Sequence, residues 1–263
     1  MPEKFNMATQ EENHIDSADL FSIIQQHDQE VAPTLADDEA AHEQEHYLQS
    51  IHSKLVIRQL PSQGLSFQIW PAANTLVSLL EQYHNQPSNN PLSPILKCGR
   101  PLRILELGSG TGLVGIAAAA ILLHANVTIT DLPHVLPNIQ FNATANSGAL
   151  ELNSGTVDVR SLRWGEAEDM EAIGRDFDIV LGTDVVYHDN LYDPLLRTLQ
   201  FFLGEESNIV FVMAHLRRWK KESAFFKKAK KMFQVQTIHS DAPLPGARIG
   251  VVVYSFKGKC TRM

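Results

Sequence analysis

The sequence predicts an α/β fold: a doubly wound, mainly parallel sheet of seven strands that ends in an antiparallel hairpin. From residue 102 onward, strand and helix patterns alternate, as in sheets with helices on both faces. Residues 179–181 and 209–213 are short continuous apolar runs, which are typical of central parallel strands. The strand-like segments 233–239 and 248–256 are separated by too few residues for a helical crossover, so they must pair antiparallel.

The elements before the sheet are less regular. We expect a helix over residues 36–51, a strand over 54–60, a turn at Gln63 and Gly64, and a second strand over 65–69 that completes a hairpin. Trp70 and Pro71 begin a helix that runs to about residue 83, because a proline in the first helical turn lacks only a donor that has no partner there. Residues 85–101, with four prolines among Asn and Ser, predict a loop.

The alternating part of the chain then supplies the sheet and its covering helices. The expected strands are 102–107, 126–130, 156–160, 177–182 and 208–214, followed by the two hairpin strands. The expected helices are 112–123, 134–146, 190–203 and 219–232. A helix thus separates most successive strands, as in a doubly wound sheet, although none is predicted between 156–160 and 177–182.

Composition and charge divide the chain into two regions. Its 263 residues, 44% hydrophobic and 20% charged, suit one globular α/β domain. Residues 1–50 carry twelve acids and one lysine, for a net charge of −11, whereas the remainder carries +3. We therefore expect a mobile acidic N-terminal extension over residues 1–50 and a single domain over 51–263 that is monomeric.

The sequence also bears on location and on two further partner classes. No apolar run approaches the roughly 20 residues needed to span a bilayer, and two distant cysteines fit a reducing compartment, so we expect a cytoplasmic or nuclear protein without membrane contact. The basic segment 217–231 has an apolar side that includes Phe225 and Phe226. A solvated helix face explains it better than nucleic-acid binding, although an acidic partner, or the acidic extension itself, is an alternative.

The strongest local signal is a glycine loop between an apolar strand and an apolar helix. Strand 102–107 carries Glu106 and is followed by Gly108, Ser109, Gly110, Thr111 and Gly112. Glycines let the backbone turn tightly and approach a ligand closely, and the helix N-terminus completes the ligand crevice of an open α/β sheet. We therefore expect a nucleoside cofactor at this loop.

Charge chooses between the two cofactor classes that fit this loop. The spacing of Gly110, Gly112 and Gly115 also fits a dinucleotide site, which leaves an NAD-dependent oxidoreductase as an alternative. The Glu106 carboxylate would repel a pyrophosphate by about 1 kcal/mol or more, but it would attract the ammonium and sulfonium groups of S-adenosylmethionine. Asp131, at the end of the next strand, can accept both ribose hydroxyl protons. We therefore favour S-adenosylmethionine.

A second group of candidate residues follows the strand 177–182. Thr183, Asp184 and Tyr187 lie where this strand ends, at the same sheet edge as the glycine loop, and substrate chemistry occurs at this edge in open α/β sheets. Together with Trp70 upstream and Trp164 after the third strand, these residues resemble the seven-β-strand protein-lysine methyltransferases of the methyltransferase-like family, also called methyltransferase family 16. The similarity covers roughly residues 50–256.

The resemblance implies a class I methyltransferase fold and a pocket for S-adenosylmethionine. It places Trp70, the Gly108 to Gly110 loop, Asp131, Trp164 and Thr183 in that pocket, although relatives often have alanine at the Thr183 position. It also implies a protein partner whose lysine side chain accepts the methyl group. Acceptors that stay open are a protein histidine, a nucleic acid and a small molecule.

Methyl transfer needs an oriented amine with a free lone pair. We expect Asp184 to accept a hydrogen bond from the acceptor amine and Tyr187 to form the wall of its channel. His42 and His46 match a zinc-hydrolase helix pattern, but the segment is acidic and no third ligand is evident, so we expect no metal. The remaining histidines, His215 among them, appear isolated in the sequence.

Overall fold

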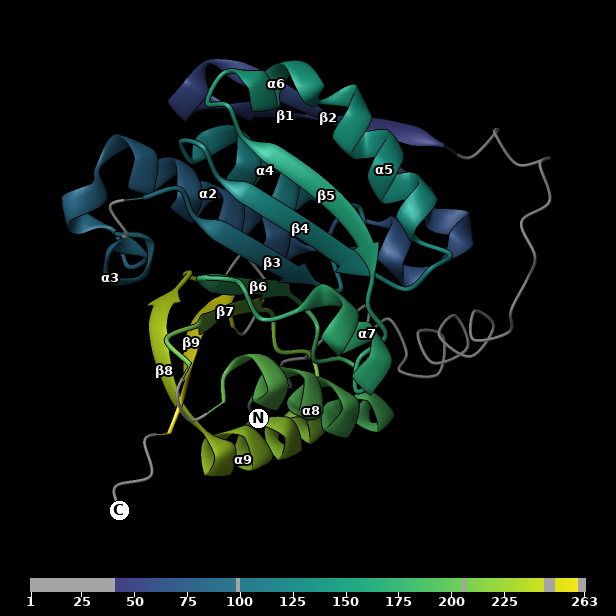
Figure 1. Ribbon diagram of the computed structural model, residues 1–263, viewed down its shortest axis with the longest axis vertical. Coiled ribbons are helices and arrows are strands. Elements are labelled where there is room, and N and C mark those ends of the chain that lie inside the picture. The colour runs from purple at the N-terminus through teal and green to yellow at the C-terminus, as the bar shows by residue number, and fades with distance from the viewer. Residues whose placement is uncertain (1–40, 98–99, 205–206, 244–248, 260–263) are drawn as a thin grey trace, which may run out of the picture.

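The computed structural model describes residues 41–97, 100–204, 207–243 and 249–259. Within these ranges a seven-stranded sheet crosses the molecule in the order β5-β4-β3-β6-β7-β9-β8 (Figure 1). β3 to β7 pair in parallel, and β9 lies antiparallel between β7 and β8. The strands are β3 (Arg103–Leu107), β4 (Asn126–Asp131), β5 (Thr156–Ser161), β6 (Ile179–Thr183), β7 (Val210–His215), β8 (Phe233–Ser240) and β9 (Val252–Gly258). The predicted fold class, with its closing hairpin, is confirmed.

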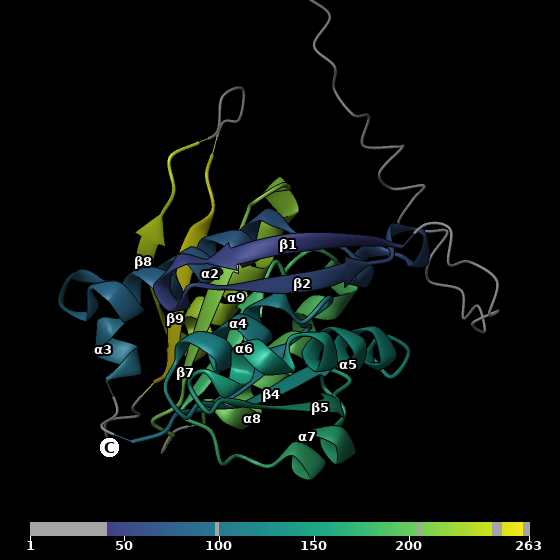
Figure 2. The ribbon, with the colours of Figure 1, turned by 90° about the horizontal axis from the view of Figure 1, so that it is seen from above.

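Helices cover both faces of this sheet (Figures 1 and 2). One face carries α2 (Pro71–Asn85), α4 (Leu113–Ile121), α5 (Leu136–Ala145) and α6 (Ser147–Glu151), and the other carries α7 (Ala167–Ile173), α8 (Tyr192–Phe202) and α9 (Ser223–Met232). Each layer fills its own apolar core: Ile104 of β3 packs into the first and its neighbour Leu105 into the second. Because successive residues enter different cores, apolar residues are needed on both sides of the strand.

The N-terminal part of the described chain forms a two-stranded ribbon. β1 (His42–Leu48) pairs antiparallel with β2 (Ser53–Gln59), so the helix predicted over residues 36–51 is wrong where the structure describes it. β1 is exposed along most of its length and has no apolar face of its own. Its conformation comes from pairing with β2, a strand whose Leu55 and Ile57 are buried. Residues 1–40 of the predicted extension lie outside the described residues.

Helix α5 holds this ribbon against the main domain, as Figure 2 shows from above. Asn138, Asn142 and Asn146 follow one another at four-residue spacing and so lie on one face of the helix. The side-chain oxygens of Asn142 and Asn146 accept hydrogen bonds from the backbone N–H groups of Arg58 and Val56, each at 2.8 Å. These amides complete the hydrogen bonding of an edge strand that would otherwise be open.

The predicted strand over residues 65–69 is also wrong. Leu65–Phe67 form a short 3-10 helix after Gly64, whose φ is +118°, so this segment cannot pair with β2. Phe67 is buried, and its backbone N–H bonds back to Gly64. The segment therefore packs beside the glycine loop, where it contributes to the cavity described below. The proline-rich stretch 85–101, predicted to be a loop, contains the short helix α3 (Ser93–Leu96). None of the described helices is both long and apolar enough to cross a membrane.

Candidate functional site

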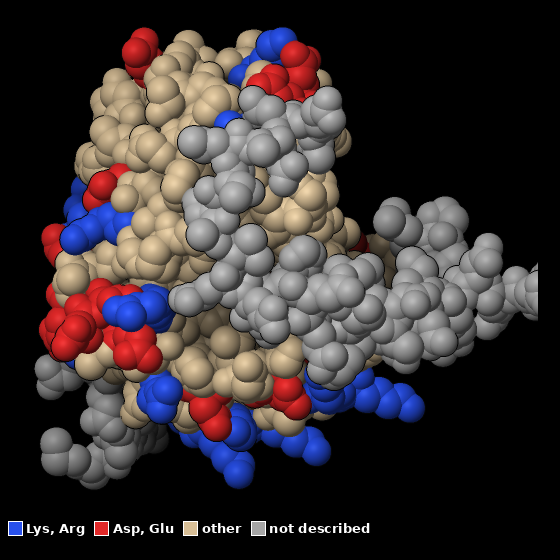
Figure 3. Space-filling view, turned by 90° about the vertical axis from the view of Figure 1, so that its right-hand side faces the viewer, with Lys and Arg blue, Asp and Glu red and all other residues tan. Residues whose placement is uncertain are grey.

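A cavity of about 590 Å³ lies at the carboxyl ends of β3, β4 and β6. These ends point to the right in Figure 1, which is the face turned toward the viewer in Figure 3. Where Figure 3 shows described residues, acidic and basic side chains gather along the upper, left-hand and lower edges of this face. Nine of the predicted site residues line the cavity: Trp70, Gly108, Ser109, Gly110, Asp131, Trp164, Thr183, Asp184 and Tyr187.

The glycine loop forms a close-fitting wall of this cavity. Gly108 and Gly110 each have a φ of +59°, a conformation that favours glycine. A Cβ on Gly108 would lie 2.7 Å from the Cζ2 atom of Trp164, and one on Gly110 would lie 2.9 Å from the backbone oxygen of Ser66. The loop can approach its neighbours, and a ligand, only because both side chains are absent.

Asp131 fixes the loop from the end of β4. Its Oδ2 accepts a hydrogen bond from the Gly110 N–H at 2.8 Å, and its Oδ1 accepts one from the Leu132 N–H at 2.7 Å. Burial raises the pKa of Asp131 above its usual value, although these two hydrogen bonds oppose that effect. The carboxylate borders the cavity with lone pairs to spare, so it can also accept ribose hydroxyl protons.

Glu106 and Gly112, two further predicted cofactor-binding residues, do not line the cavity. Glu106 is 1% exposed and lies beneath the loop, where its Oε2 accepts the Gly115 N–H at 3.0 Å. Gly115 must be glycine here, because a Cβ would lie 2.6 Å from that same oxygen. Burial raises the pKa of Glu106 to about 8. At neutral pH this carboxyl is therefore mostly protonated, whereas the sequence argument assumed a full negative charge.

Asp184 lines the cavity directly after β6 and has a φ of +52°, a left-handed conformation that aspartate tolerates better than most residues. Its Oδ1 accepts the Leu216 N–H at 2.8 Å, and its Oδ2 accepts a hydrogen bond from Arg218 at 2.9 Å. Burial alone would raise the pKa of Asp184, but hydrogen bonds from His215 and Arg218 lower it below the usual value. Asp184 therefore stays ionised at neutral pH.

Arg218 and Trp219 line the cavity but were missed by the sequence analysis, which assigned them to a basic helix. The helix α9 begins only at Ser223, and both residues lie in the connection after β7. The Arg218 guanidinium lies 4.9 Å from the centre of the Trp70 ring. The sequence did contain a signal for these two residues, because they follow a parallel strand that ends at the same sheet edge as Asp184. The same argument from strand order predicted Asp184.

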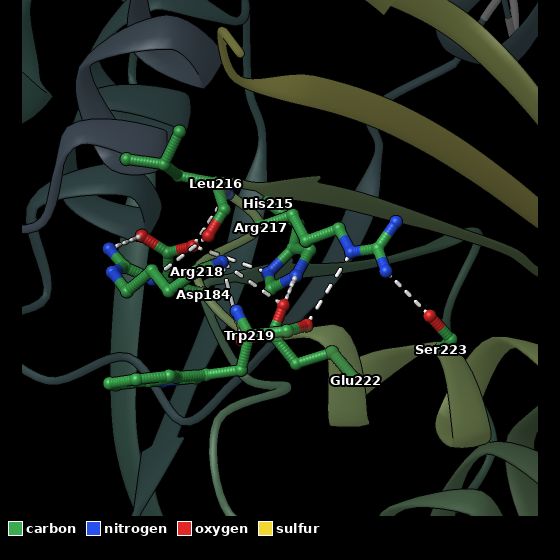
Figure 4. A network of polar contacts seen from close by, with 8 residues as sticks. All are labelled: Asp184, His215, Leu216, Arg217, Arg218, Trp219, Glu222 and Ser223. Carbon is green, nitrogen blue, oxygen red and sulfur yellow. Dashed lines mark hydrogen bonds and ion pairs between the residues drawn. The ribbon is translucent and has the colours of Figure 1, made fainter. Parts of the chain in front are cut away.

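His215 is not isolated. It is 1% exposed at the end of β7, and its ring lies between two carboxylates, with Nδ1 3.4 Å from Asp184 Oδ1 and Nε2 3.1 Å from Glu222 Oε2 (Figure 4). His42 and His46 lie on the strand β1, not on the helix that a zinc-hydrolase pattern requires. Among the described residues, no group of three or more His, Cys, Asp or Glu side chains is arranged to hold a metal ion.

Comparison with known proteins identifies relatives of the chain. The profile of a family described as lysine methyltransferase matches residues 49–232. EEF1A lysine methyltransferase 3 of Xenopus tropicalis is 39% identical over 125 residues, which are 48% of this chain and 52% of that protein. The protein N-lysine methyltransferase METTL21A of Danio rerio is 33% identical over 180 residues, which are 68% of this chain and 73% of that protein.

Solved structures that resemble this chain include that of a predicted O-methyltransferase, Atu636 of Agrobacterium tumefaciens. Its TM-score is 0.48, and it is 18% identical over 63% of this chain and 80% of that one. The alignment with the Xenopus protein spans about half of that relative's length. The family profile covers more than half of the present chain, and it includes the glycine loop, Asp131 and Asp184. The resemblance inferred from the sequence is thus confirmed, and the chain belongs to the lysine methyltransferase family.

Proposed function

We propose that this protein is an S-adenosylmethionine-dependent protein-lysine N-methyltransferase. The observation that carries the proposal is one cavity lined by two different groups of residues, in a chain of the lysine methyltransferase family. The first group, here called the donor end, is a glycine loop held by Asp131, and the second, the acceptor end, contains Asp184 and Tyr187. The first suits a nucleoside donor and the second suits a cationic acceptor side chain.

The residues at the first end fit the donor. The backbone from Gly108 to Gly110, which lines the cavity without side chains, would lie against it. Asp131 would accept the ribose hydroxyl protons, and the half-buried Trp70 and Trp164 would supply apolar surface. When bound, S-adenosylmethionine supplies a methyl group on a positively charged sulfur.

The second end would orient the acceptor. The lysine nitrogen forms a bond to the methyl carbon while the carbon–sulfur bond breaks, and the departing electron pair leaves the sulfur as a neutral thioether. The amine must reach the cavity without its proton, which is lost to water at the mouth, where Tyr187 is 36% exposed. Because Asp184 stays ionised and both of its oxygens are engaged, we assign it orientation of the amine rather than removal of its proton.

Incubation of the full chain with S-adenosylmethionine labelled in its methyl group and a cell extract tests the function. We expect label on lysine side chains of protein, located by mass spectrometry. Label only on histidine, RNA or small molecules would refute the lysine assignment. Calorimetric titration with S-adenosylmethionine and with NAD distinguishes the oxidoreductase alternative, since we expect binding of the first and none of the second.

Asp184→Asn tests the acceptor end. Asparagine has the same shape and tolerates the left-handed backbone, so the fold and donor binding should persist while methyl transfer falls at least tenfold. Asp176→Asn is the matched control, because Asp176 is 87% exposed and pairs with Arg103 at the other end of β3. Full activity of Asp184→Asn with normal donor binding would remove Asp184 from the mechanism.

A further inference from the structure

A buried group of charged side chains lies directly behind the acceptor end of the cavity. It joins three segments that are separate in the sequence: Asp184 after β6, His215 at the end of β7, and Glu222 in the turn before α9 (Figure 4). Asp184 is 8% exposed, and His215 and Glu222 are each 1% exposed. Burying charge at this depth is costly, so the arrangement calls for an explanation beyond stability.

The position of the ring between two carboxylates favours a positive charge on His215. A neutral imidazole has one N–H, so one of its two nitrogens would direct a lone pair at a carboxylate. An imidazolium is hydrogen-bonded to Glu222 through Nε2, and its Nδ1 lies 3.4 Å from Asp184 Oδ1, an ion-pair distance at which the charge is attracted to this carboxylate as well. With the Arg218 guanidinium 2.9 Å from Asp184, two positive charges then balance two negative ones. Burial lowers the pKa of His215, but the two carboxylates raise it by more than burial lowers it, so the net shift of the pKa is upward.

Glu222 connects this charge to the cavity wall. Besides the His215 ring, its carboxylate accepts the backbone N–H groups of Arg218 and Trp219, each at 3.2 Å. Both of these residues line the cavity, and Arg218 lies over the Trp70 ring. Any movement of Glu222 would therefore move the wall that faces the acceptor, and His215 holds Glu222 in place.

We propose that His215, acting with Glu222, is a positioning residue for methyl transfer: as an imidazolium it orients the Asp184 carboxylate and fixes the Arg218–Trp219 wall of the acceptor channel. Neither residue lines the cavity, so both act through their neighbours. The proposal rests on the proposed function for its kinetic consequence and on the buried geometry for the charge of the histidine.

The other ionisable groups around this cluster do not replace His215. Tyr192 of α8 and Tyr254 of β9 are close to Glu222, and the pKa of each is raised by burial and by that carboxylate. Both phenols are therefore uncharged at neutral pH. Arg217 lies on the solvent side, where it bonds to Ser223. Loss of the His215 proton would leave an uncompensated buried carboxylate and release the wall.

The first test does not depend on activity. In full-length protein labelled with ¹⁵N at histidine and tryptophan, we expect the His215 ring to stay protonated above pH 6.5, with the Trp219 indole signal moving in the same titration. Glu222→Gln removes one carboxylate, so the His215 proton affinity should fall at least tenfold, which is one pH unit. His215→Gln assigns the signal. A wild-type His215 that is neutral at pH 6.5 overturns the proposal.

The second test separates positioning from stability. At saturating donor, His215→Gln and Glu222→Gln should lower kcat at least tenfold, while the donor KM stays within twofold. Glu222→Gln should also move the alkaline fall in kcat to lower pH. The control is His239→Gln, which removes another histidine–carboxylate pair, with Asp241, on the edge strand β8 and outside the cavity lining. Unchanged kcat and pH profile, or a donor KM that rises along with the loss of kcat, would refute the positioning role.

The two tests distinguish failure of this proposal from failure of the proposed function. A wild-type protein that methylates no protein refutes the lysine methyltransferase assignment. The joint titration of His215 and Trp219 still decides whether the imidazolium orders the wall, because it needs no substrate.

Discussion

Replacing Glu106 by glutamine should change how the stability of the protein depends on pH. Burial raises the pKa of this carboxyl from 4.5 to about 8 in the folded protein, so the unfolded chain ionises first as the pH rises. The free energy of unfolding must therefore fall between about pH 4.5 and pH 8. The full span corresponds to about 5 kcal/mol, since one pKa unit is worth about 1.4 kcal/mol. Glutamine cannot ionise, and its oxygen can still accept the Gly115 N–H.

The assay measures the free energy of unfolding in urea for the wild type and Glu106→Gln at pH 5, 6, 7 and 8, with circular dichroism as the signal. The difference between the two proteins cancels the other titrating groups, so it isolates Glu106. We expect the wild type to lose about 1.4 kcal/mol relative to the variant for each pH unit in this range. A difference that does not vary with pH would show that Glu106 is ionised when buried and would refute the argument from burial.

Three further predictions concern the loop, the donor site and the opposite sheet edge. Gly110→Ala should weaken S-adenosylmethionine binding at least tenfold in calorimetry, because its φ is +59° and its Cβ would meet the backbone oxygen of Ser66. The control Gly148→Ala, whose Cβ would have no atom within 4 Å, should bind normally. Asp131→Asn should also weaken binding roughly tenfold, since one charge-assisted hydrogen bond is worth about 1.5–3 kcal/mol; unchanged affinity would place Asp131 outside the donor site. Burial raises the pKa of Asp178, but hydrogen bonds from arginines lower it by more and hold it at about 2. Thermal stability should therefore fall from pH 4 to pH 2 in the wild type and fall less in Asp178→Asn. Equal losses in the two proteins would contradict this.

The central fold could be predicted because each parallel strand carries its own signal. Ile104 and Leu105 enter opposite cores, so the strand had to be apolar on both sides, and that pattern is visible without the structure. β1 carries no such signal, because it is an exposed strand whose hydrogen bonds come from β2. The strand prediction for residues 65–69 failed for a related reason. An apolar run with the buried Phe67 has the pattern of a strand, but the backbone conformation of Gly64 directs the segment away from β2.

The candidate site could be predicted where function depends on backbone shape or on strand order. The glycine loop and Asp131 follow from the first, and Asp184 from the second. Glu106 lies in the predicted element, but its burial, and so its protonation, depends on the contact with Gly115 that only the fold creates. His215 was missed because Asp184 and Glu222, which give it a charge, come from different elements.

The two ends of the cavity are thus stabilised by different means, and this difference predicts how each responds to pH. The donor end depends on glycine backbone and on hydrogen bonds from N–H groups to Asp131, and Glu106, whose pKa is about 8, lies beneath its loop. The acceptor end depends on a buried histidine that must stay protonated to hold two carboxylates and the Arg218–Trp219 wall. A rise in pH should therefore act on both ends, and a fall in methyl transfer that persists in Glu106→Gln, with donor binding intact, should come from the acceptor end.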